Sequence, residues 1–189
     1  MAARVVILDR DGVINEDSDS YIRSLSDWRP IAGSIEAIAA LSQAGYTVAV
    51  ATNQSGLGRG YFELEALESI HAKLNMLVAE QGGVVSGIFY CPHTPEEDCQ
   101  CRKPATGLLR AIESELYISV HDAFFIGDSL KDLQAGEAAG CLPVLVKTGK
   151  GMQTLAKIQR EDVALDNPKN IPVFADLAEA AQYILKQQH

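Results

Sequence analysis

Three cysteines and a histidine stand close together in the middle of the chain, in the stretch CPHTPEEDCQCRKP. Cys91, His93, Cys99 and Cys101 form the pattern C-x-H-x5-C-x-C, which offers four soft or borderline metal ligands on one short loop. Structural zinc is normally closed by four protein ligands, whereas catalytic zinc keeps one position open for water. The pattern therefore predicts a closed, structural Zn²⁺ site. A redox-active C-x-C pair beside an unrelated histidine is the alternative.

Three aspartates follow apolar runs of the sequence and could hold a second kind of metal. Asp9 and Asp11, in DRDG, come after RVVIL, and Asp128, in GDSLKD, follows another apolar run. Aspartate is common in turns, so the DRDG pair alone leaves a turn-forming role open. Three carboxylates at one sheet edge repel one another unless a cation lies between them, and oxygen ligands favour a hard ion. We therefore expect Asp9, Asp11 and Asp128 to form a catalytic Mg²⁺ site.

The elements that must position these residues alternate between short β-rich runs and amphipathic segments. Strands are expected at 4–8, 46–51, 87–90, 122–128 and 142–147 and near 173, and helices at 33–45, about 63–81, 106–116, 129–140, before 173 and from 176 onwards. This alternation is typical of repeated βα units, so we predict an α/β fold with a Rossmann-like, doubly wound, mostly parallel sheet. Segment 14–30 is irregular and polar, and we expect a long loop or flap there.

Unusual polar residues collect just after five of the expected strands. These loops read DRDG, TNQSG, CPH…CRKP, GDS and KTGKG. In an open parallel sheet the ligand crevice lies outside the carboxyl ends of the strands. We therefore expect the five loops to meet at one site.

Length and composition bound the class of protein. A chain of 189 residues with 47% hydrophobic and 22% charged residues is expected to form one soluble domain, residues 1–189. Its net charge of -9 counts against nucleic acid and anionic membranes as partners, because both select basic surfaces. No apolar run approaches the ~20 residues of a membrane span, and Asp9 interrupts the first apolar run, which argues against a signal peptide. We therefore expect a cytoplasmic protein, with monomer as the default state.

In chain order, the motifs resemble those of the haloacid dehalogenase-like phosphatases. DRDG resembles the first motif of that superfamily, and GDSLKD, with Asp128 as metal carboxylate, resembles the fourth. Thr52 and Asn53 resemble the second motif, and Lys103 in RKP the third. The chain leaves no room for a large cap domain between these motifs, so the site is expected to be open, with loops that select the substrate.

The resemblance implies a role for each motif residue. Asp9 would be the nucleophile that forms an aspartyl phosphate, and Asp11 the acid/base. Thr52 would donate a hydrogen bond to a phosphoryl oxygen, and Lys103 would stabilise the charge of the transition state. To protonate a leaving group, Asp11 must keep its proton at a pH well above ~3.9, the pKa of a free aspartate. We therefore expect the site to raise the pKa of Asp11.

The cysteine-rich loop is similar to that of the heptose bisphosphate phosphatases, a branch of this superfamily with a C-x-H…C-x-C zinc loop immediately before an Arg-Lys pair. This likeness implies removal of the C7 phosphate of a small sugar phosphate, D-glycero-D-manno-heptose 1,7-bisphosphate. The reaction would serve the synthesis of nucleotide-activated heptose and lipopolysaccharide precursors. A histidinol-phosphate phosphatase is the nearest alternative. A zinc-stapled binding protein without activity is a further alternative, which the presence of every motif residue disfavours.

Several other polar residues have open roles. Asn53, Arg102 and Arg59 are candidate substrate-binding residues, because the fork of an arginine can bind a phosphate or sugar hydroxyl at two points. Lys147 and Lys150 are further candidates for a second phosphate, although these two and Arg59 could equally be solvated surface charges.

Two residues of GDSLKD and the lone histidines remain. Asp132 lies one helical turn after Asp128 and is expected either to join the metal site or to be solvated, and Ser129 is expected to cap its helix. Cys141 is expected to be a small buried hydrophobe. The lone histidines, which have no evident partner in the sequence and are expected to be structural or solvent-facing, are His71, His121 and His189.

Overall fold

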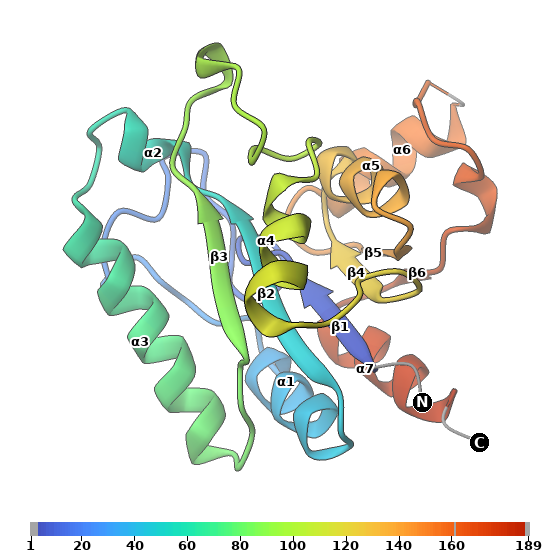
Figure 1. Cartoon of the computed structure of the whole chain (residues 1–189), viewed down its shortest axis with the longest axis horizontal. Coiled ribbons are helices and arrows are strands. Elements are labelled where there is room, and N and C mark those ends of the chain that lie inside the picture. The colour runs from blue at the N-terminus through green and yellow to red at the C-terminus, as the bar shows by residue number, and fades with distance from the viewer. Residues whose placement is uncertain (1–3, 161, 188–189) are drawn as a thin grey trace.

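Six parallel strands form one sheet in the order β3-β2-β1-β4-β5-β6 (Figure 1). The computed structural model describes residues 4–160 and 162–187. The strands are β1 (Val5–Leu8), β2 (Thr47–Asn53), β3 (Gly87–Cys91), β4 (Phe124–Gly127), β5 (Leu142–Val146) and β6 (Val173–Phe174). The helices are α1 (Ser34–Gln43), α2 (Ser55–Gly58), α3 (Leu64–Glu80), α4 (Gly107–Leu116), α5 (Leu130–Ala138), α6 (Gly151–Gln159) and α7 (Leu177–Lys186), with 3-10 turns η1 (Pro95–Glu97) and η2 (Pro168–Asn170). The predicted doubly wound α/β fold is confirmed.

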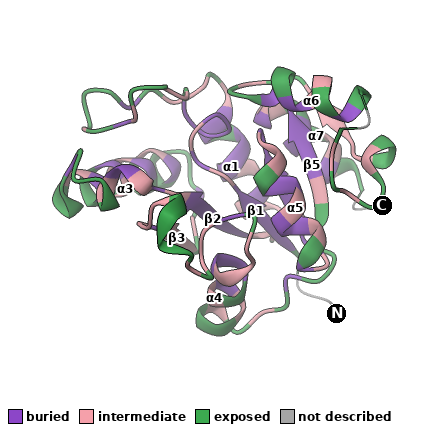
Figure 2. Ribbon diagram, turned by 90° about the horizontal axis from the view of Figure 1, so that it is seen from above, coloured by how far each residue is buried: buried purple, intermediate pink, exposed green. Residues whose placement is uncertain are grey.

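The central strand β1 shows how the sequence fills both faces of the sheet. Successive side chains of a strand point to opposite faces. Val6 and Leu8 pack into the cluster that includes residues of α1, α3 and α7, whereas Val5 and Ile7 pack into the cluster that includes residues of α4 and α5. Figure 2 shows the buried strands between α1 on one face and α4 on the other. A strand buried on both faces reads as the unbroken apolar run that the sequence contains.

The short helix α2 differs from the loop expected after the second strand. Leu57 N donates to Gln54 O at 3.1 Å, and Arg59 N donates to Ser55 O at 3.0 Å, which closes one helical turn. Gly58 N donates to Pro92 O at 3.1 Å, and a Cβ on Gly58 would lie only 2.5 Å from that oxygen. The glycine is therefore needed where α2 packs against the start of the cysteine-rich loop.

The segment from residue 14 to 30 is irregular, as expected, but it is anchored to the core. Ile22 and Trp28 are both buried, and Asn15 forms an isolated bridge with Pro30. The ring of Tyr21 packs edge-on against Tyr61 with 5.1 Å between centroids. Within the described residues this segment is the only insertion between β1 and α1, so no large cap lies there.

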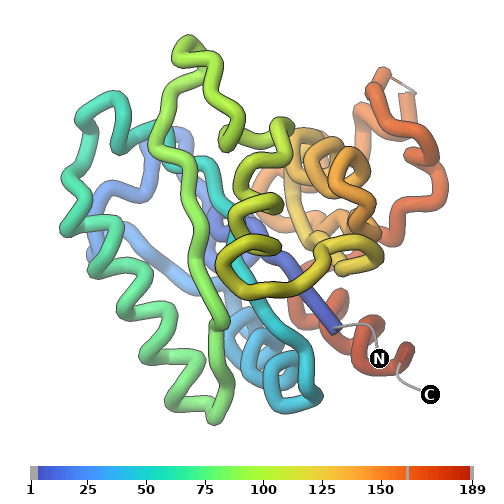
Figure 3. The backbone as a smooth tube through the Cα atoms, in the orientation of Figure 1, coloured from blue at the N-terminus to red at the C-terminus, as the bar shows by residue number. Residues whose placement is uncertain are grey.

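The chain after β3 extends past the carboxyl end of the sheet before it returns as α4 (Figure 3). This stretch carries the cysteines and the RKP motif. No helix among the described residues is long and apolar enough to cross a membrane.

Candidate active site

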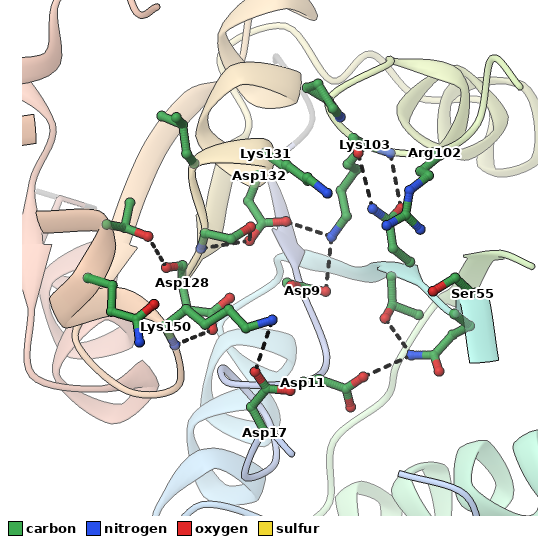
Figure 4. Close-up of a pocket in the computed structure, with 18 of the residues that line it drawn as sticks. Asp9, Asp11, Asp17, Ser55, Arg102, Lys103, Asp128, Lys131, Asp132 and Lys150 are labelled. Atoms are coloured by element: carbon green, nitrogen blue, oxygen red, sulfur yellow. Dashed lines mark hydrogen bonds and ion pairs between the residues drawn. The ribbon is translucent and has the colours of Figure 1, made fainter. Parts of the chain in front are cut away.

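A cavity of about 600 Å³ opens at the carboxyl end of the sheet (Figure 4). Loops that follow β1, β2, β4 and β5 line it together with residues 102–104. The residues singled out from the sequence that line it are Asp9, Asp11, Thr52, Asn53, Arg102, Lys103, Asp128, Ser129, Asp132 and Lys150. The structure therefore brings most of the expected site residues to one place.

The ammonium group of Lys103 is the centre of a buried charge network. Its Nζ lies 2.9 Å from Asp9 Oδ1 and 2.6 Å from Asp132 Oδ1, and donates to Ala51 O at 2.7 Å. The ammonium group therefore makes one hydrogen bond and two close ion pairs. Burial alone would lower the pKa of Lys103, but the carboxylates of Asp132 and Asp9 outweigh it and raise that pKa. Lys103 therefore provides a charged group in a fixed position.

Asp132 links this lysine to the start of α5. Its Oδ2 accepts hydrogen bonds from Ser129 N at 3.1 Å and Ser129 Oγ at 2.8 Å, while Oδ1 faces Lys103. The pair forms a capping box, with Ser129 as N-cap and Asp132 at the third helical position. The expected capping role of Ser129 is confirmed. Asp132 is only 1% exposed, so the solvated alternative for this residue was wrong.

Asp128 is held by the loop after β5. Lys150 N donates to Asp128 Oδ2 at 2.8 Å, and Thr154 Oγ1 donates to Asp128 O at 2.8 Å. Gly12 and Gly149 press against the same carboxylate, because a Cβ on either would lie about 2 Å from Oδ2, at 2.1 Å and 2.2 Å. Both glycines have positive φ, +83° and +55°. The DRDG and KTGKG loops thus contact the Asp128 carboxylate through backbone groups, and the Thr154 side chain holds its carbonyl oxygen.

Three carboxylates approach one another at the floor of the cavity. Oxygen atoms of Asp9, Asp128 and Asp132 all lie within 4.8 Å of each other. Burial and the charge of Asp132 raise the pKa of Asp9, and the same two causes raise the pKa of Asp128 to about 7. One lysine cannot neutralise three carboxylates. A further cation, bound by their oxygen atoms, would balance the remaining negative charge. We call these three residues the carboxylate centre.

Asp11 lies at the cavity wall but outside the carboxylate centre. Its Oδ1 accepts hydrogen bonds from Arg10 Nε at 2.9 Å and Asn15 Nδ2 at 3.0 Å, and its Oδ2 accepts one from Gln54 Nε2 at 3.1 Å. Burial would raise the pKa of Asp11, but Arg10 and these hydrogen bonds outweigh it and lower the pKa. The expected raised pKa is wrong for this structure, because the sequence did not reveal that the neighbouring arginine turns inward. Its carboxylate also joins no oxygen cluster with Asp9 and Asp128.

The end of β2 contributes three consecutive polar residues. Thr52 Oγ1 accepts a hydrogen bond from Gln54 Nε2 at 2.9 Å. Asn53 pairs with the backbone of Lys103, because Asn53 Nδ2 donates to Lys103 O at 3.1 Å and Lys103 N donates to Asn53 Oδ1 at 3.0 Å. Asn53 thus holds the lysine segment with both amide atoms. Gln54 was not singled out from the sequence, where it stood only as part of a loop.

The basic residues divide into those at the cavity and those away from it. Arg102, Lys131 and Lys150 line the cavity, and Lys150 Nζ lies 3.5 Å from Asp17 Oδ2. Arg59 lies outside it, 3.6 Å from Glu96 Oε2, and Lys147 does not line it either. Lys131 was missed from the sequence, although it stands beside Asp132 in GDSLKD. Burial, together with the positive charges of Arg102 and Lys150, lowers its pKa.

The four predicted zinc ligands converge on one point. They lie in residues 91–101, which we call the cysteine loop. Cys91 Sγ lies 3.5 Å from His93 Nδ1, 3.5 Å from Cys99 Sγ and 2.9 Å from Cys101 Sγ. His93 Nδ1 lies 3.2 Å from Cys101 Sγ, and the cysteines are free thiols. Four ligands around a tetrahedral zinc, with bonds of about 2.0–2.3 Å, have separations of about 3.3–3.8 Å. Two of the four separations, at 3.5 Å, fall in this range and two, at 2.9 Å and 3.2 Å, are shorter, and the four converging N and S donors suit a closed zinc site.

The remaining cysteine and the histidines have ordinary surroundings with one exception. Cys141 is buried, as expected, and donates to Val120 O at 3.3 Å. His121 is largely exposed beside Asp122, and His189 lies outside the described residues. His71 does have a partner, because its Nε2 lies 3.2 Å from Arg10 Nη1.

Comparisons with known proteins find similar phosphatases in sequence and in fold. The family model described as HAD-hydrolase-like matches residues 100–180. A D-glycero-beta-D-manno-heptose-1,7-bisphosphate 7-phosphatase of Pseudomonas aeruginosa is 54% identical over 98% of this chain and 100% of its own, and one from Neisseria meningitidis is 46% identical over 97% of this chain and 96% of its own. The crystal structure of D,D-heptose 1,7-bisphosphate phosphatase from Bordetella bronchiseptica with magnesium and phosphate superposes with a TM-score of 0.89, at 45% identity and coverages of 97% and 99%.

Proposed function

Because the chain belongs to the D-glycero-β-D-manno-heptose-1,7-bisphosphate 7-phosphatase family of haloacid dehalogenase-like hydrolases, we propose that it hydrolyses the C7 phosphate of that bisphosphate. The observation that carries the proposal is the contact of Asp9 with a buried lysine at the floor of an open cavity. The product would serve the synthesis of nucleotide-activated heptose and of lipopolysaccharide precursors. Free cysteines gathered as metal ligands support a reducing compartment, the cytoplasm, and we retain monomer as the default state.

The first step transfers the phosphoryl group to the protein. One carboxylate oxygen of Asp9 attacks the phosphorus, and the bond from phosphorus to the C7 oxygen breaks with its electron pair remaining on that oxygen. Asp11 gives this oxygen a proton, so the sugar leaves as an alcohol. Lys103, fixed 2.9 Å from Asp9, offsets the charge that gathers on the phosphoryl oxygens, and Thr52 donates to one of them.

The second step restores the protein. A water molecule attacks the phosphorus of the aspartyl phosphate, gives a proton to the Asp11 carboxylate and displaces the Asp9 carboxylate. Phosphate leaves, and the proton taken from water replaces the proton that Asp11 gave to the leaving group in the first step. In the free protein the pKa of Asp11 is lowered, so its proton must be retained by the charge of the bound phosphate, since a nearby anion raises the pKa of a carboxyl group.

Two metal ions fit the donor groups. Asp9 and Asp128 offer carboxylate oxygens to Mg²⁺, which when bound would reduce the repulsion between these carboxylates and the phosphate. Asp11, the third ligand expected from the sequence, remains a proposed ligand residue of this ion, although its carboxylate accepts hydrogen bonds from Arg10, Asn15 and Gln54. Cys91, His93, Cys99 and Cys101 would hold Zn²⁺ as a closed structural site.

Basic side chains at the cavity support a bisphosphate over a monophosphate substrate. Arg102, Lys131 and Lys150 line the cavity, where a second phosphate could meet them, and Lys150 is also ion-paired with Asp17. Histidinol phosphate has no second phosphate and carries an amino group that these three residues would repel. Arg59 is paired with Glu96 outside the cavity, so we do not assign it a substrate contact.

The test compares phosphate release from heptose 1,7-bisphosphate and from histidinol phosphate under the same Mg²⁺ conditions. We expect kcat/KM to be larger for the bisphosphate by about 100-fold or more, because the second phosphate gains charge-assisted hydrogen bonds of ~1.5–3 kcal/mol each. A preference for histidinol phosphate would reverse the assignment. Release from neither substrate, by a folded protein that contains zinc, would favour a zinc-stapled binding protein.

A further inference from the structure

Arg10 is a fully buried cation behind the cavity wall, and the mechanism above gives it no role. Its Nε and Nη2 each lie 2.9 Å from Asp11 Oδ1, and Nη2 also donates to Gln54 Oε1 at 3.3 Å. On the far side, Nη1 lies 3.2 Å from His71 Nε2. Burial and Arg10 lower the pKa of His71 to about 4, so the ring is neutral and accepts this hydrogen bond. The guanidinium is therefore fixed between an anion and two neutral acceptors.

Arg10 sets the orientation of the Gln54 side-chain amide. With Gln54 Oε1 directed at Arg10, the NH₂ group donates to Asp11 Oδ2 at 3.1 Å and to Thr52 Oγ1 at 2.9 Å. The opposite orientation would bring the amide oxygen against a carboxylate and the NH₂ group against a cation. Only one of the two amide orientations is electrostatically favourable, and the charge of Arg10 selects it.

The two carboxylate oxygens of Asp11 consequently have different hydrogen-bonding environments. Oδ1 is surrounded by three donors, Nε and Nη2 of Arg10 and Nδ2 of Asn15. Oδ2 receives a hydrogen bond from Gln54 alone among the described residues, and Asp11 lines the cavity. An oxygen crowded by three donors has no lone pair free for a further proton, so Oδ2 is the oxygen that can carry one.

We propose that Arg10 is a positioning residue for proton transfer: it holds Oδ1 of Asp11 directly and, through Gln54, directs Oδ2 towards the leaving-group oxygen. The inference rests on the proposed function, because it assumes that Asp11 protonates the leaving group. The same chain of contacts also serves Thr52. Because Gln54 donates to the Thr52 oxygen, the hydroxyl hydrogen of Thr52 remains available for a phosphoryl oxygen.

The experiment measures how strongly activity depends on the leaving group. Arg10→Lys keeps the buried charge but lacks the fork that reaches Asp11 and Gln54 together, and Gln54→Leu removes the link to Oδ2. Each variant is assayed with Mg²⁺ on 4-nitrophenyl phosphate, whose leaving group departs without a proton, and on phenyl phosphate, whose more basic leaving group needs one. The readout is the ratio of the two kcat/KM values, in which any loss common to both substrates cancels.

For either variant we expect the ratio of 4-nitrophenyl to phenyl phosphate to rise about tenfold or more, since general acid catalysis contributes about 10²–10⁴-fold. If Arg10 acts through Gln54, the double variant should raise the ratio no further than the larger single change, because the two substitutions remove one shared interaction. An unchanged ratio in a folded Gln54→Leu protein would overturn the proposal, even if Arg10→Lys failed to fold.

Arg110→Lys is the matched control, because Arg110 is a surface arginine whose side chain is 59% exposed and pairs with Glu113. It should leave the ratio unchanged. A failure of the proposed function looks different from a failure of this inference. In the first case the wild-type protein cleaves aryl phosphates but ignores heptose 1,7-bisphosphate, and in the second the variants lose activity equally on both aryl esters.

Discussion

The carboxylate centre and the cysteine loop both hold Lys103 in place, but they do so by different physical means. The carboxylate centre lies on regular elements, because Asp9 follows β1, Asp128 follows β4 and Asp132 lies in the first turn of α5. The cysteine loop contains only one 3-10 turn, and its four candidate metal ligands converge on one point. The carboxylate centre is therefore positioned by the sheet, whereas the proposed zinc ion would cross-link the loop that precedes Lys103.

The two regions also differ in what they do to stability. In the carboxylate centre, burial and the charge of Asp132 disfavour the ionised forms of Asp9 and Asp128 and raise their pKa values. The cysteine loop gathers groups that a metal ion would join, and metal binding to a site absent from the unfolded chain is itself folding free energy. The carboxylate centre is thus expected to lower the stability of the metal-free protein, and the cysteine loop with the proposed zinc bound is expected to raise it.

Asp9→Asn gives the sharpest test of this contrast. We expect kcat to fall about 10⁴-fold or more, because the amide cannot act as the nucleophile. The free energy of unfolding should stay the same or rise by roughly 1 kcal/mol, since a neutral group replaces a repelled carboxylate. Phosphate release and urea unfolding on the same preparation measure both effects. Near-normal turnover by this variant would remove Asp9 from the mechanism.

Cys101→Ser addresses the other region. We expect loss of bound zinc and a fall of about 3 kcal/mol in the free energy of unfolding, because a structural metal ion is lost. Activity should fall about 10–100-fold, less than for Asp9→Asn, since Asn53 still binds the backbone of Lys103. Metal analysis and urea unfolding provide the measurements.

Cys141→Ser is the control for that substitution. Cys141 is buried and donates to Val120 O at 3.3 Å, a hydrogen bond that a serine hydroxyl can also make. We expect unchanged zinc content and a loss of about 1 kcal/mol or less. If both cysteine variants lost the same stability and neither lost a metal ion, the cysteine loop would not be cross-linked by zinc.

The position of the chemistry could be predicted from the sequence because backbone rules determine it. RVVIL and AFFI read as buried strands, and parallel strands bring the residues after them to one edge of the sheet. Asp9 and Asp128 therefore meet as expected. The cysteine loop was equally predictable, since its four ligands lie within one short stretch and need no long-range folding to approach one another.

The directions of side chains between those positions could not be predicted. Arg10 stands between two aspartates in a turn, where an arginine is ordinarily solvated, yet it is buried and reverses the expected pKa shift of Asp11. Asn53, a predicted substrate contact that lines the cavity, also pairs with a backbone segment 50 residues away, and Arg59 pairs with Glu96. Such pairings depend on tertiary contacts that have no local pattern in the sequence.

The pH dependence of stability gives the smallest and most specific test of repulsion in the carboxylate centre. The folded pKa of Asp128, about 7, lies above its ordinary value of 3.8, so the folded state binds more protons than the unfolded chain between these values. In Mg²⁺-free buffer, lowering the pH from about 8 to 6 should therefore add about 1 kcal/mol to the free energy of unfolding through this residue. Asp128→Asn should abolish that contribution.

The comparison must be between wild type and variant, because His71 acts in the opposite direction. Its folded pKa of about 4 lies below the ordinary 6.5, so the unfolded chain binds the extra proton and stability falls as the pH drops through 6.5. This contribution is common to both proteins and cancels in their difference. Equal slopes for the two proteins would mean that burial and the charge of Asp132 do not raise the pKa of Asp128. A steeper rise for wild type, which saturating Mg²⁺ abolishes, would identify the repelled carboxylates as the groups that the metal ion stabilises.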